Sequence, residues 1–281
     1  MRDILQAIEN SAIRINNAIK KADGSYSENQ NQTGDTQLKL DVLGDEIIED
    51  EFKKCKSIKE IISEEKEDKV AINPEGEYYI GYDPVDGSSL VDVNQSVGSI
   101  FGIYNDSSFA GSSLVASVYV VYGARVDLVI AREKVELYRL NKSEKFEFIK
   151  NISLNEKGSI SATGGTQKDW LPHHRELVDK LFKDGYKLEY CGGMVPDLHN
   201  ILLNKGGLFS YPATTDKPKS KLRIIFEIFP FAQIFERAGG KATDGVNRLL
   251  DFTPEHLHDT MPSFFGSSYE IEEVKKFYAN K

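Results

Sequence analysis

The sequence predicts a mixed α/β fold in which a largely antiparallel sheet is followed by a second sheet with α/β alternation. Apolar runs at residues 125–131, 134–140 and 145–150 are separated by only a few residues, which is typical of antiparallel hairpins. In the last third of the chain, strand-like and helix-like segments alternate instead. We therefore expect an N-terminal half, residues 1–153, and a C-terminal half, residues 154–281, within one compact unit.

Composition and charge narrow the class of protein. The 281 residues are 40% hydrophobic and 28% charged, as in ordinary globular proteins. The net charge of −9 argues against a general binder of nucleic acid or membrane surfaces. No signal-peptide pattern opens the sequence, no apolar run approaches the ~20 residues of a membrane span, and Cys55 and Cys191 are too few for a disulfide framework. We expect a cytoplasmic protein.

The N-terminal segments are two helices separated by a polar stretch. Isoleucines and an alanine recur every three or four positions across residues 2–21, which predicts an amphipathic helix. Residues 22–36 have no apolar period and predict a long loop, either a tip or a functional lid. A second amphipathic pattern covers residues 38–52, and an apolar strand-like run at residues 57–62 follows it.

Acidic residues at the ends of these elements have two interpretations. Asp41 lies in the first turn of the second helix, where an acid usually only complements the helix dipole. Glu64 and Glu65 follow the strand-like run and would ordinarily be a solvated pair. If another acid-bearing strand end lies beside them, however, clustered carboxylates would form a Mg²⁺ site. The sequence leaves this choice open.

The segment around which the chain is organised follows the aromatic run at residues 78–82. That run predicts a buried strand, which we expect to end at Asp83-Pro84 because proline cannot continue a central ladder. After Asp86, Gly87-Ser88-Ser89 offers backbone N–H groups for an anion at the start of the next element. Asp-Pro and Asp-Gly are also ordinary turn formers, but this combination of five residue types rarely occurs by chance.

The middle of the chain completes the first sheet. Residues 96–104 predict a buried strand and residues 112–122 a mixed helical stretch, followed by the three hairpin strands. A strand at residues 159–163 continues the series. The adjacent histidines His173 and His174 lie in a polar helix, residues 171–182, and we expect them at the surface because metal-binding pairs prefer wider spacing.

The last third contains a long apolar helix. Strands are predicted at residues 186–191 and 207–212, with a helix between them that ends at Leu203. Residues 221–238 are apolar nearly all round and predict a buried helix kinked at Pro230.

Within that helix Arg223 and Glu227 are four residues apart, so they would share a face. They would form either an internal salt bridge or a phosphate site beside a metal. Gly239-Gly240 ends the helix, and residues 263–281 supply a closing strand and an amphipathic helix.

These residues belong to a series of motifs in one order. Besides the segment from Asp83 to Ser89 they are Thr33-Gly34-Asp35, Leu40-Asp41-Val42-Leu43, Ser63-Glu64-Glu65, Val97-Gly98-Ser99-Ile100-Phe101-Gly102-Ile103-Tyr104, Gly193-Met194-Val195-Pro196-Asp197-Leu198-His199, Lys221-Leu222-Arg223, Glu227 and Ala238-Gly239-Gly240. From about Leu5 to Tyr278 the chain resembles the class I fructose-1,6-bisphosphatase family of lithium-sensitive, metal-dependent phosphatases. The resemblance implies a layered αβαβα sugar-phosphatase fold. It also implies Mg²⁺-dependent hydrolysis of the 1-phosphate of fructose 1,6-bisphosphate in gluconeogenesis.

The resemblance also implies a role for each site residue. Two or three Mg²⁺ ions per site, or alternatively Mn²⁺ or Zn²⁺, would be held by Glu64, Glu65, Asp83, the Val85 carbonyl, Asp86 and Glu227. The attacking water would be oriented and deprotonated by Asp35, Asp41 and Glu65. The substrate would be bound by Asp86, Gly87, Ser88, Ser89, Tyr190, Tyr211, Lys221 and Arg223. Clustered Mg²⁺ ions would neutralise the phosphate, activate the water and stabilise the leaving alkoxide.

Some positions depart from the family pattern. Glu189 stands where the family has an arginine that reaches into the neighbouring subunit's site, and Thr163 and Thr166 replace an Asn and a Tyr of that pocket. An acid would repel a phosphate, so we expect the distal pocket to be rebuilt from Lys168, Arg175 or Lys187. The family's AMP-binding turn has no counterpart, so we expect little response to AMP. A homotetramer is the family's habit.

Three alternatives remain beside the main hypothesis. The segment from Gly192 to Asp197 also resembles sedoheptulose-1,7-bisphosphatase, which could be the sole or a second activity. An inositol-monophosphatase-type enzyme fits less well, because that branch has Trp-Asp where Phe226-Glu227 stands. A non-catalytic sugar-phosphate-binding protein would be expected to lack a metal ligand, and every expected carboxylate is present.

Overall fold

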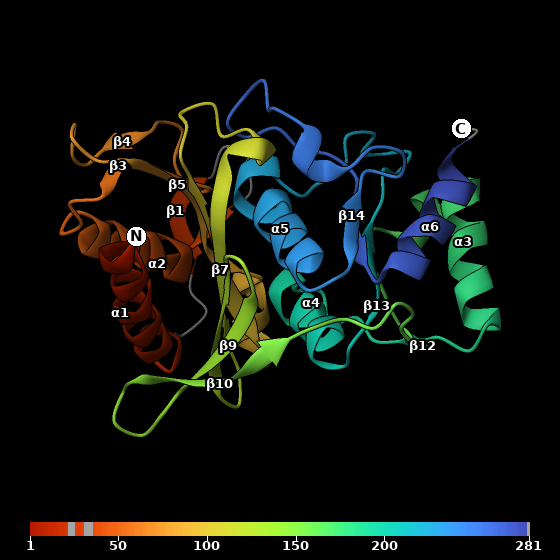
Figure 1. Cartoon of the computed structure of the whole chain (residues 1–281), viewed down its shortest axis with the longest axis horizontal. Helices are drawn as coiled ribbons and strands as arrows, with labels where there is room; N and C mark the ends of the chain where they lie inside the picture. Colours follow the sequence, from red (N-terminus) through yellow and green to blue (C-terminus); the bar gives the residue numbers. More distant parts are fainter. Residues whose placement is uncertain (22–25, 31–35, 280–281) are drawn as a thin grey trace.

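The computed structural model describes residues 1–21, 26–30 and 36–279, and for residues 26–30 and 36–38 the backbone alone. Five layers follow one another across the molecule: a helix pair, an eight-stranded sheet, a central helix layer, a five-stranded sheet and a second helix pair (Figure 1). The helices of the three helical layers are, in chain order, α1 Arg2–Ile19, α2 Lys39–Phe52, α3 Pro172–Lys183, α4 Met194–Leu203, α5 Phe229–Arg237 and α6 Ser268–Tyr278. The predicted αβαβα fold is confirmed.

The larger sheet is antiparallel except at one strand pair. Its strand order is β10-β9-β8-β7-β6-β5-β3-β4, and only β3 and β5 run parallel. Its strands are β3 Ile58–Ser63, β4 Val70–Ala71, β5 Tyr78–Asp86, β6 Val97–Tyr104, β7 Leu114–Tyr122, β8 Val126–Ala131, β9 Val135–Leu140 and β10 Phe146–Ile152. The helices α1 and α2 lie on one face of this sheet, and α4 and α5 lie on the other (Figure 1).

The smaller sheet is mixed. Its order is β12-β11-β13-β15-β14, with β11 parallel to β12 and β13, and β15 antiparallel to its two neighbours. Its strands are β11 Ile160–Thr163, β12 Lys187–Leu188, β13 Gly207–Tyr211, β14 Lys241–Thr243 and β15 Ser263–Gly266. The helices α3 and α6 cover its outer face (Figure 1).

Three apolar clusters lie between these layers. The largest fills the space between the two sheets around α5, where Phe226, Phe229, Phe231 and Phe235 are inaccessible to solvent. A second lies between the large sheet and α1 with α2, and a third lies between the small sheet and α3 with α6. Because the central cluster draws residues from both sheets, the two predicted halves share one core.

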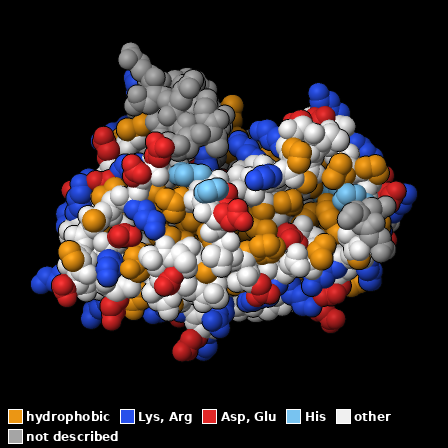
Figure 2. Space-filling view, turned by 90° about the horizontal axis from the view of Figure 1, so that it is seen from above, with side chains coloured by type: hydrophobic (Ala, Val, Ile, Leu, Met, Phe, Trp, Pro, Cys, Tyr) orange, Lys and Arg blue, Asp and Glu red, His pale blue; other side chains and the backbone are white. Residues whose placement is uncertain are grey.

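The outer surface carries charges of both signs. On the face in Figure 2, acidic and basic side chains are interspersed around a central band where hydrophobic side chains are visible. Within the described residues, none of the helices combines the length and apolarity needed to cross a bilayer.

The predicted helix at residues 112–122 is wrong. After a short 3₁₀ turn, Gly111–Ser113, these residues form β7, which lies between β6 and β8 and is buried almost throughout. Its sequence is rich in valine and tyrosine, which suit a pleated strand covered on both faces. The apolar residues fall on both sides of the strand, so they show no alternation.

The strand that carries the acidic motif does not end at Asp83-Pro84. Strand β5 continues to Asp86, and its register with β6 shifts between Asp83 and Asp86. Pro84 is accommodated because it lies in this irregularity, where its missing N–H removes no ladder bond. The bulge has a functional consequence described below.

The polar stretch 22–36 is not wholly a loop. The backbone forms strand β1, Tyr26–Gln30, which pairs antiparallel with β2, Thr36–Leu38. Residues 22–25 and 31–35 lie outside the described residues, so the predicted lid and Asp35 remain predictions. The predicted strand at residues 186–191 is reduced to β12.

The long apolar helix is two helices of different type. Ile224–Ile228 forms a π-helical turn, and α5 begins at Phe229 with Pro230 in its first turn, where proline needs no N–H donor. The predicted kink is therefore a change of helix type. Arg223 is extended and precedes the turn, so it does not share a helix face with Glu227.

The two histidines of α3 are buried, contrary to prediction. His174 is inaccessible to solvent, and its ring nitrogens lie 3.2 Å from Thr163 Oγ1 and 3.0 Å from the Tyr278 hydroxyl. Burial lowers the pKa of His174 to about 3, so the imidazole is neutral and packs as a polar core residue. The helix is polar in composition, but this face is covered by α6.

Candidate active site

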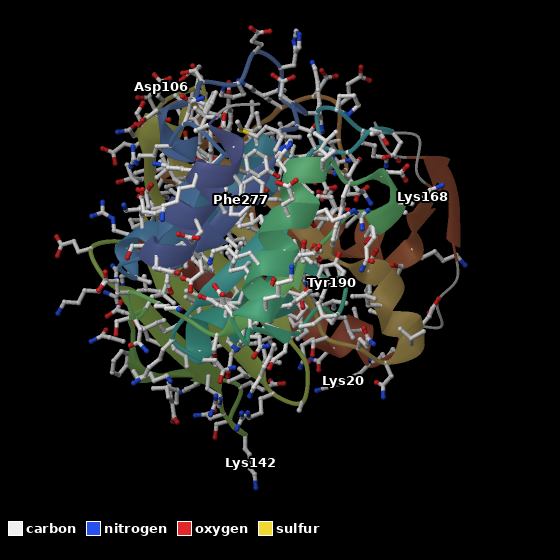
Figure 3. The ribbon with its side chains drawn as sticks, turned by 90° about the vertical axis from the view of Figure 1, so that its right-hand side faces the viewer. Lys20, Asp106, Lys142, Lys168, Tyr190 and Phe277 are labelled. Carbon is white, nitrogen blue, oxygen red and sulfur yellow. The ribbon has the colours of Figure 1, made fainter. Side chains whose placement is uncertain are left out.

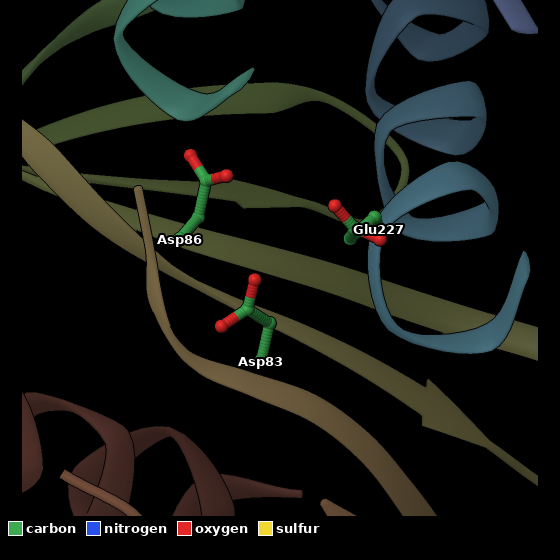
Figure 4. A group of neighbouring side chains, drawn as sticks. All are labelled: Asp83, Asp86 and Glu227. Carbon is green, nitrogen blue, oxygen red and sulfur yellow. The ribbon is translucent and has the colours of Figure 1, made fainter. Parts of the chain in front are cut away.

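Three carboxylates converge in the interior between the two sheets. Asp83 and Asp86 come from the end of β5, and Glu227 comes from the π-helical turn before α5 (Figure 4). One oxygen of each lies within 4.8 Å of the others. Asp83 and Glu227 are 3% and 7% exposed, so the surrounding protein shields the cluster from water.

The bulge in β5 is what turns both aspartates to one side. In a regular strand, residues three apart point to opposite faces, so Asp83 and Asp86 could not meet. The Val85 N–H donates to Asp83 Oδ1 over 3.0 Å, and the Ser99 hydroxyl donates to the Pro84 carbonyl over 2.6 Å. These bonds fix the bulged backbone around buried Val85.

Asp86 also caps helix α4. The Val195 N–H donates to Asp86 Oδ2 over 2.7 Å at the start of α4, where the helix leaves its first N–H groups unpaired. Burial raises the pKa of Asp86 to about 7, although the bond from Val195 opposes that rise and nearby Glu227 adds to it. The motif therefore connects the large sheet to the central helix layer.

The other two acids are shifted in the same direction. Burial raises the pKa of Asp83 well above its usual range, and the negative charges of Asp86, Glu227, Glu65 and Asp41 raise it further. Burial also raises the pKa of Glu227, with the charge of Arg223 opposing that rise. Such a cluster of close, buried acids is stabilised when a cation neutralises it.

Glu64 and Arg223 form the edge of this cluster. The Glu64 N–H donates to the Tyr82 carbonyl over 2.9 Å, so the turn after β3 lies beside β5. The Arg223 guanidinium forms an ion pair with the Glu64 carboxylate, and the Arg223 backbone N–H donates to Glu227 Oε2 over 2.6 Å. The predicted alternative of an Arg223–Glu227 side-chain bridge is thus replaced by an Arg223–Glu64 pair.

The donor set fits a hard divalent cation. Carboxylate oxygens are the ligands that Mg²⁺ and Mn²⁺ prefer, and Zn²⁺ usually takes nitrogen or sulfur ligands as well. Asp83, Asp86 and Glu227 are the only described group of three or more His, Cys, Asp or Glu residues whose ligand atoms approach this closely. Because burial raises the pKa values of all three carboxyls, a positive charge beside them would favour their ionised forms.

Backbone donors lie next to the acids. Gly87 adopts a left-handed conformation, φ 74°, which directs the chain from β5 into a short 3₁₀ helix, Ser88–Val93. The first N–H groups of such a helix, those of Ser88 and Ser89, have no acceptor inside it. An anion adjacent to the carboxylate cluster would find these donors within the same turn.

A pocket of about 340 Å³ has three lining residues, Tyr190, Tyr211 and Lys221, that interact electrostatically with Asp86 or Glu227 of the cluster. The sequence-predicted residues Tyr190, Tyr211, Lys221 and Thr166 line it. The remaining lining residues are Gly165, Pro212, Thr214, Asp216, Lys217 and Ser220. Two lysines and two tyrosines around a partly enclosed space suit a polyhydroxylated, negatively charged ligand.

The cations that line this pocket are not those that the sequence analysis suggested for the distal phosphate. Among the described residues that line it, the cations are Lys217 and Lys221, and none of Lys168, Arg175 and Lys187 is included. Figure 3 shows Lys168 and Tyr190 at separate places on one side of the molecule. Lys217 was missed because nothing in its sequence context distinguishes it from the other lysines of the segment 217–221.

Two departures from the family pattern have structural explanations. The Glu189 carboxylate accepts a 2.6 Å bond from the Asn200 amide on α4, which gives the acid a partner other than a ligand. Thr163 is buried and accepts a 2.8 Å bond from the Ser210 hydroxyl, so it is part of the core rather than the pocket. Arg175 donates to the Gln167 carbonyl and lies over Trp170, and it is not among the residues that line the pocket.

The remaining predicted residues divide into two groups. Asp41 is buried on α2, and Glu65 lies on the turn after β3, where its N–H donates to the Ser63 hydroxyl over 3.2 Å. Both charges act on Asp83, which places them near the cluster. Asp35 lies outside the described residues.

Family models match nearly the whole chain. Residues 1–150 match a model described as fructose-1-6-bisphosphatase, N-terminal domain, and residues 154–279 match its C-terminal domain. A class 1 fructose-1,6-bisphosphatase from Campylobacter jejuni is 52% identical over 279 residues, with 99% of each chain covered. One from Campylobacter concisus is 52% identical over 285 residues, covering 100% of this chain and 99% of that one.

Solved structures share the fold. The holo structure of Leishmania major fructose-1,6-bisphosphatase superposes with a TM-score of 0.93 at 31% identity, covering 99% of this chain and 94% of that one. A Toxoplasma gondii protein provisionally named sedoheptulose-1,7 bisphosphatase gives a TM-score of 0.91 at 28% identity, covering 99% and 93%.

The raised pKa of Asp86 predicts how stability depends on pH without metal. As pH rises from about 4 to about 7, the unfolded chain loses this proton before the folded one, so the free energy of unfolding falls. We expect Asp86→Asn to raise that free energy by about 1–3 kcal/mol near pH 8 and to leave it nearly unchanged near pH 4. Urea unfolding in the presence of a chelator measures both.

The matched control is Asp92→Asn, an exposed acid in the adjoining 3₁₀ helix, which should match wild type at both pH values. If Asp86→Asn did not raise the free energy of unfolding near pH 8, the ionised Asp86 carboxylate would not destabilise the folded protein, and the account of Asp86 would be wrong.

Proposed function

Since the chain belongs to the class 1 fructose-1,6-bisphosphatase family, we propose that its site hydrolyses the 1-phosphate of fructose 1,6-bisphosphate, giving fructose 6-phosphate and phosphate. The observation that carries the proposal is the convergence of Asp83, Asp86 and Glu227 beside the Gly87-Ser88-Ser89 donors. A cation-binding acid cluster and an anion-binding turn thus lie in one segment. Metal-assisted hydrolysis of a phosphate monoester uses this combination.

The acids would hold the metal of this metal-dependent family. Asp83, Asp86 and Glu227, with Glu64, Glu65 and the Val85 carbonyl beside them, would take two or three Mg²⁺ ions. Bound Mg²⁺ supplies charge neutralisation for phosphate oxygens and lowers the pKa of a coordinated water. The hard oxygen donor set favours Mg²⁺ or Mn²⁺ over Zn²⁺.

The reacting phosphate would lie between the turn and Arg223. The Ser88 and Ser89 N–H groups donate to its oxygens, and the Arg223 guanidinium offers a planar, bidentate donor. In the structure that guanidinium pairs with Glu64. When substrate and metal bind, Arg223 would pair with the phosphate and Glu64 with the cation. Two new pairs of opposite charge would then replace the Arg223–Glu64 pair.

The water would be handled by carboxylates rather than by a protein nucleophile. The charges of Asp41 and Glu65 raise the pKa of Asp83, which supports a place for both near the cluster. In this proposal they would accept a proton from a water held there. The sequence analysis assigned the same role to Asp35.

The distal phosphate and the sugar would occupy the adjoining pocket. Tyr190 and Tyr211 present hydroxyls and ring faces to the sugar, while Lys221 and Lys217 attract the second phosphate. Lys217 compensates for Glu189, which is bonded to Asn200 rather than directed at a ligand. Lys217 and Lys221 would thus supply positive charge to this pocket from the same chain as the acid cluster.

The relatives favour fructose over sedoheptulose. Proteins at about half identity over the full length are named fructose-1,6-bisphosphatase, whereas the protein provisionally named for sedoheptulose is 28% identical. The same pocket chemistry would admit the seven-carbon sugar as a second substrate. We further propose that the protein is cytoplasmic and assembles as a homotetramer. The exposed Leu188 on edge strand β12 and the half-exposed Tyr190 beside it offer apolar surface for contact between copies.

Phosphate release with Mg²⁺ from three esters in parallel tests the function. We expect rapid release from fructose 1,6-bisphosphate, slower release from sedoheptulose 1,7-bisphosphate and none from inositol 1-phosphate. Asp86→Ala should lower kcat at least about 10³-fold because a metal ligand is lost, while Asp92→Ala stays near wild type. Preference for the inositol ester, or silence on all three, would refute the proposal.

Lysine substitutions test the distal pocket. We expect Lys217→Met and Lys221→Met each to raise KM for fructose 1,6-bisphosphate about tenfold with little change in kcat, because each removes a charge-assisted contact to the distal phosphate. Exposed Lys219, which is not among the lining residues, provides the control in Lys219→Met. Fructose 1-phosphate lacks the distal group, so its KM should not change in either variant. Equal KM values for the bisphosphate in Lys217→Met and Lys219→Met would rule out a role for Lys217.

A further inference from the structure

The turn that carries Glu64 and Glu65 is fastened to helix α2 by the next residue, Lys66. Its Nζ lies 2.6 Å from Asp45 Oδ2 and also pairs with Glu49. The Asp45 side chain is 6% exposed, and the Tyr82 hydroxyl donates to its other oxygen over 2.7 Å. Exposed ion pairs contribute little, but a buried carboxylate such as Asp45 depends on its cation. The Lys66 side chain is therefore held against α2 by two ion pairs rather than directed into solvent.

The backbone of Lys66 is held from the opposite side by His258. The His258 Nε2 lies 2.9 Å from the Lys66 carbonyl. Because a carbonyl can only accept, Nε2 carries the hydrogen. Nδ1 is buried and has no hydrogen-bond partner among the described residues, which suits a neutral imidazole with a single N–H. The orientation of this ring is thus determined by one bond to the turn.

The segment of His258 also contacts the residues that carry Glu227. The His258 ring packs on Phe226, the residue before Glu227, with centroids 5.2 Å apart. The Ile224 N–H donates to the Asp259 carbonyl over 2.9 Å, and Thr260 forms a β-bridge with Arg223. One short segment therefore connects the turn after β3 with the π-helical turn.

We propose that Lys66 and His258 are positioning residues that hold the Glu64–Glu65 turn at the distance from Asp83, Asp86 and Glu227 that a divalent cation requires. Repulsion between the two glutamates and the three acids opposes this arrangement, and neither Lys66 nor His258 supplies a ligand of its own. Two bonds within the turn connect Lys66 and Glu65 to Ser63: Lys66 N–H to the Ser63 carbonyl at 3.2 Å, and Glu65 N–H to Ser63 Oγ at 3.2 Å. A third bond, Glu64 N–H to the Tyr82 carbonyl at 2.9 Å, holds the same turn against β5. This inference rests on the proposed metal site.

Manganese binding to metal-stripped protein provides the test, with free Mn²⁺ measured by its electron paramagnetic resonance signal. We expect Lys66→Met to weaken Mn²⁺ binding about tenfold, as is usual when a residue that orients a ligand is lost. Lys66→Arg keeps the charge and should restore binding to within about threefold. The control is Lys69→Met: Lys69 is similarly exposed but contacts Glu60 and the Phe109 ring, and its loss should leave binding unchanged.

Lys66→Met removes the cation that pairs with the buried Asp45 carboxylate, so this variant could fail to fold. A second pair of variants at His258 covers that case. His258→Phe keeps an aromatic ring on Phe226 but removes the donor, and it should weaken Mn²⁺ binding at least about threefold. His258→Gln places an amide N–H near the position of Nε2 and should bind nearly as wild type.

A merely structural role would lower the melting temperature without changing the affinity of the folded protein. Wild-type Mn²⁺ affinity in folded Lys66→Met or His258→Phe would therefore overturn the inference. The outcome is separable from the proposed function, because wild-type protein that binds Mn²⁺ but releases no phosphate refutes the activity and leaves the positioning of the acids intact.

Discussion

The mutual repulsion of Asp83, Asp86 and Glu227 is the constraint to which the rest of the structure responds. Three buried acids within 4.8 Å of one another disfavour the folded state until a cation joins them. The fold keeps the three acids together because each belongs to an element whose position is determined by contacts outside the acid cluster. The bulge in β5 is fixed by Ser99, the π-helical turn is surrounded by the central apolar cluster, and Asp86 caps α4. The stability of these layers maintains a site that is unfavourable on its own.

Much of the fold could be predicted because its periodicities are strong. The helix at residues 2–21 and the hairpin strands between residues 125 and 152 follow the predicted order. The errors arise where tertiary burial overrides local pattern. Strand β7 is covered on both faces and shows no alternation, and His174 is buried because α6 covers a helix that is polar in composition. A π-helical turn depends on one inserted residue, which periodicity does not reveal.

The chemistry of the site was easier to predict than its geometry. The segment from Asp83 to Ser89 combines cation ligands with anion donors in the sequence itself, and the structure brings Glu227 to it from the other half of the chain. The distal pocket was harder, because the side chains that line it depend on loop conformation. Lys217 lines the pocket while Lys168 does not, and residue type alone cannot distinguish them. The sequence analysis singled out Glu189 as a departure from the family pattern, but its partner Asn200 lies on another element and could not be predicted.

Proton release on cation binding is the most direct measurement of whether the acid cluster is the metal site. Titrating Mg²⁺ into metal-stripped protein by calorimetry near pH 7, in two buffers of different ionisation enthalpy, gives the number of protons released. Burial raises the pKa values of these three acids, and neighbouring negative charges raise those of Asp83 and Asp86 further. A cation bound among them should therefore displace protons, and the release should increase as the pH is lowered toward about 6. Mg²⁺ binding with no proton release at either pH would show that the cation binds elsewhere and would contradict the account.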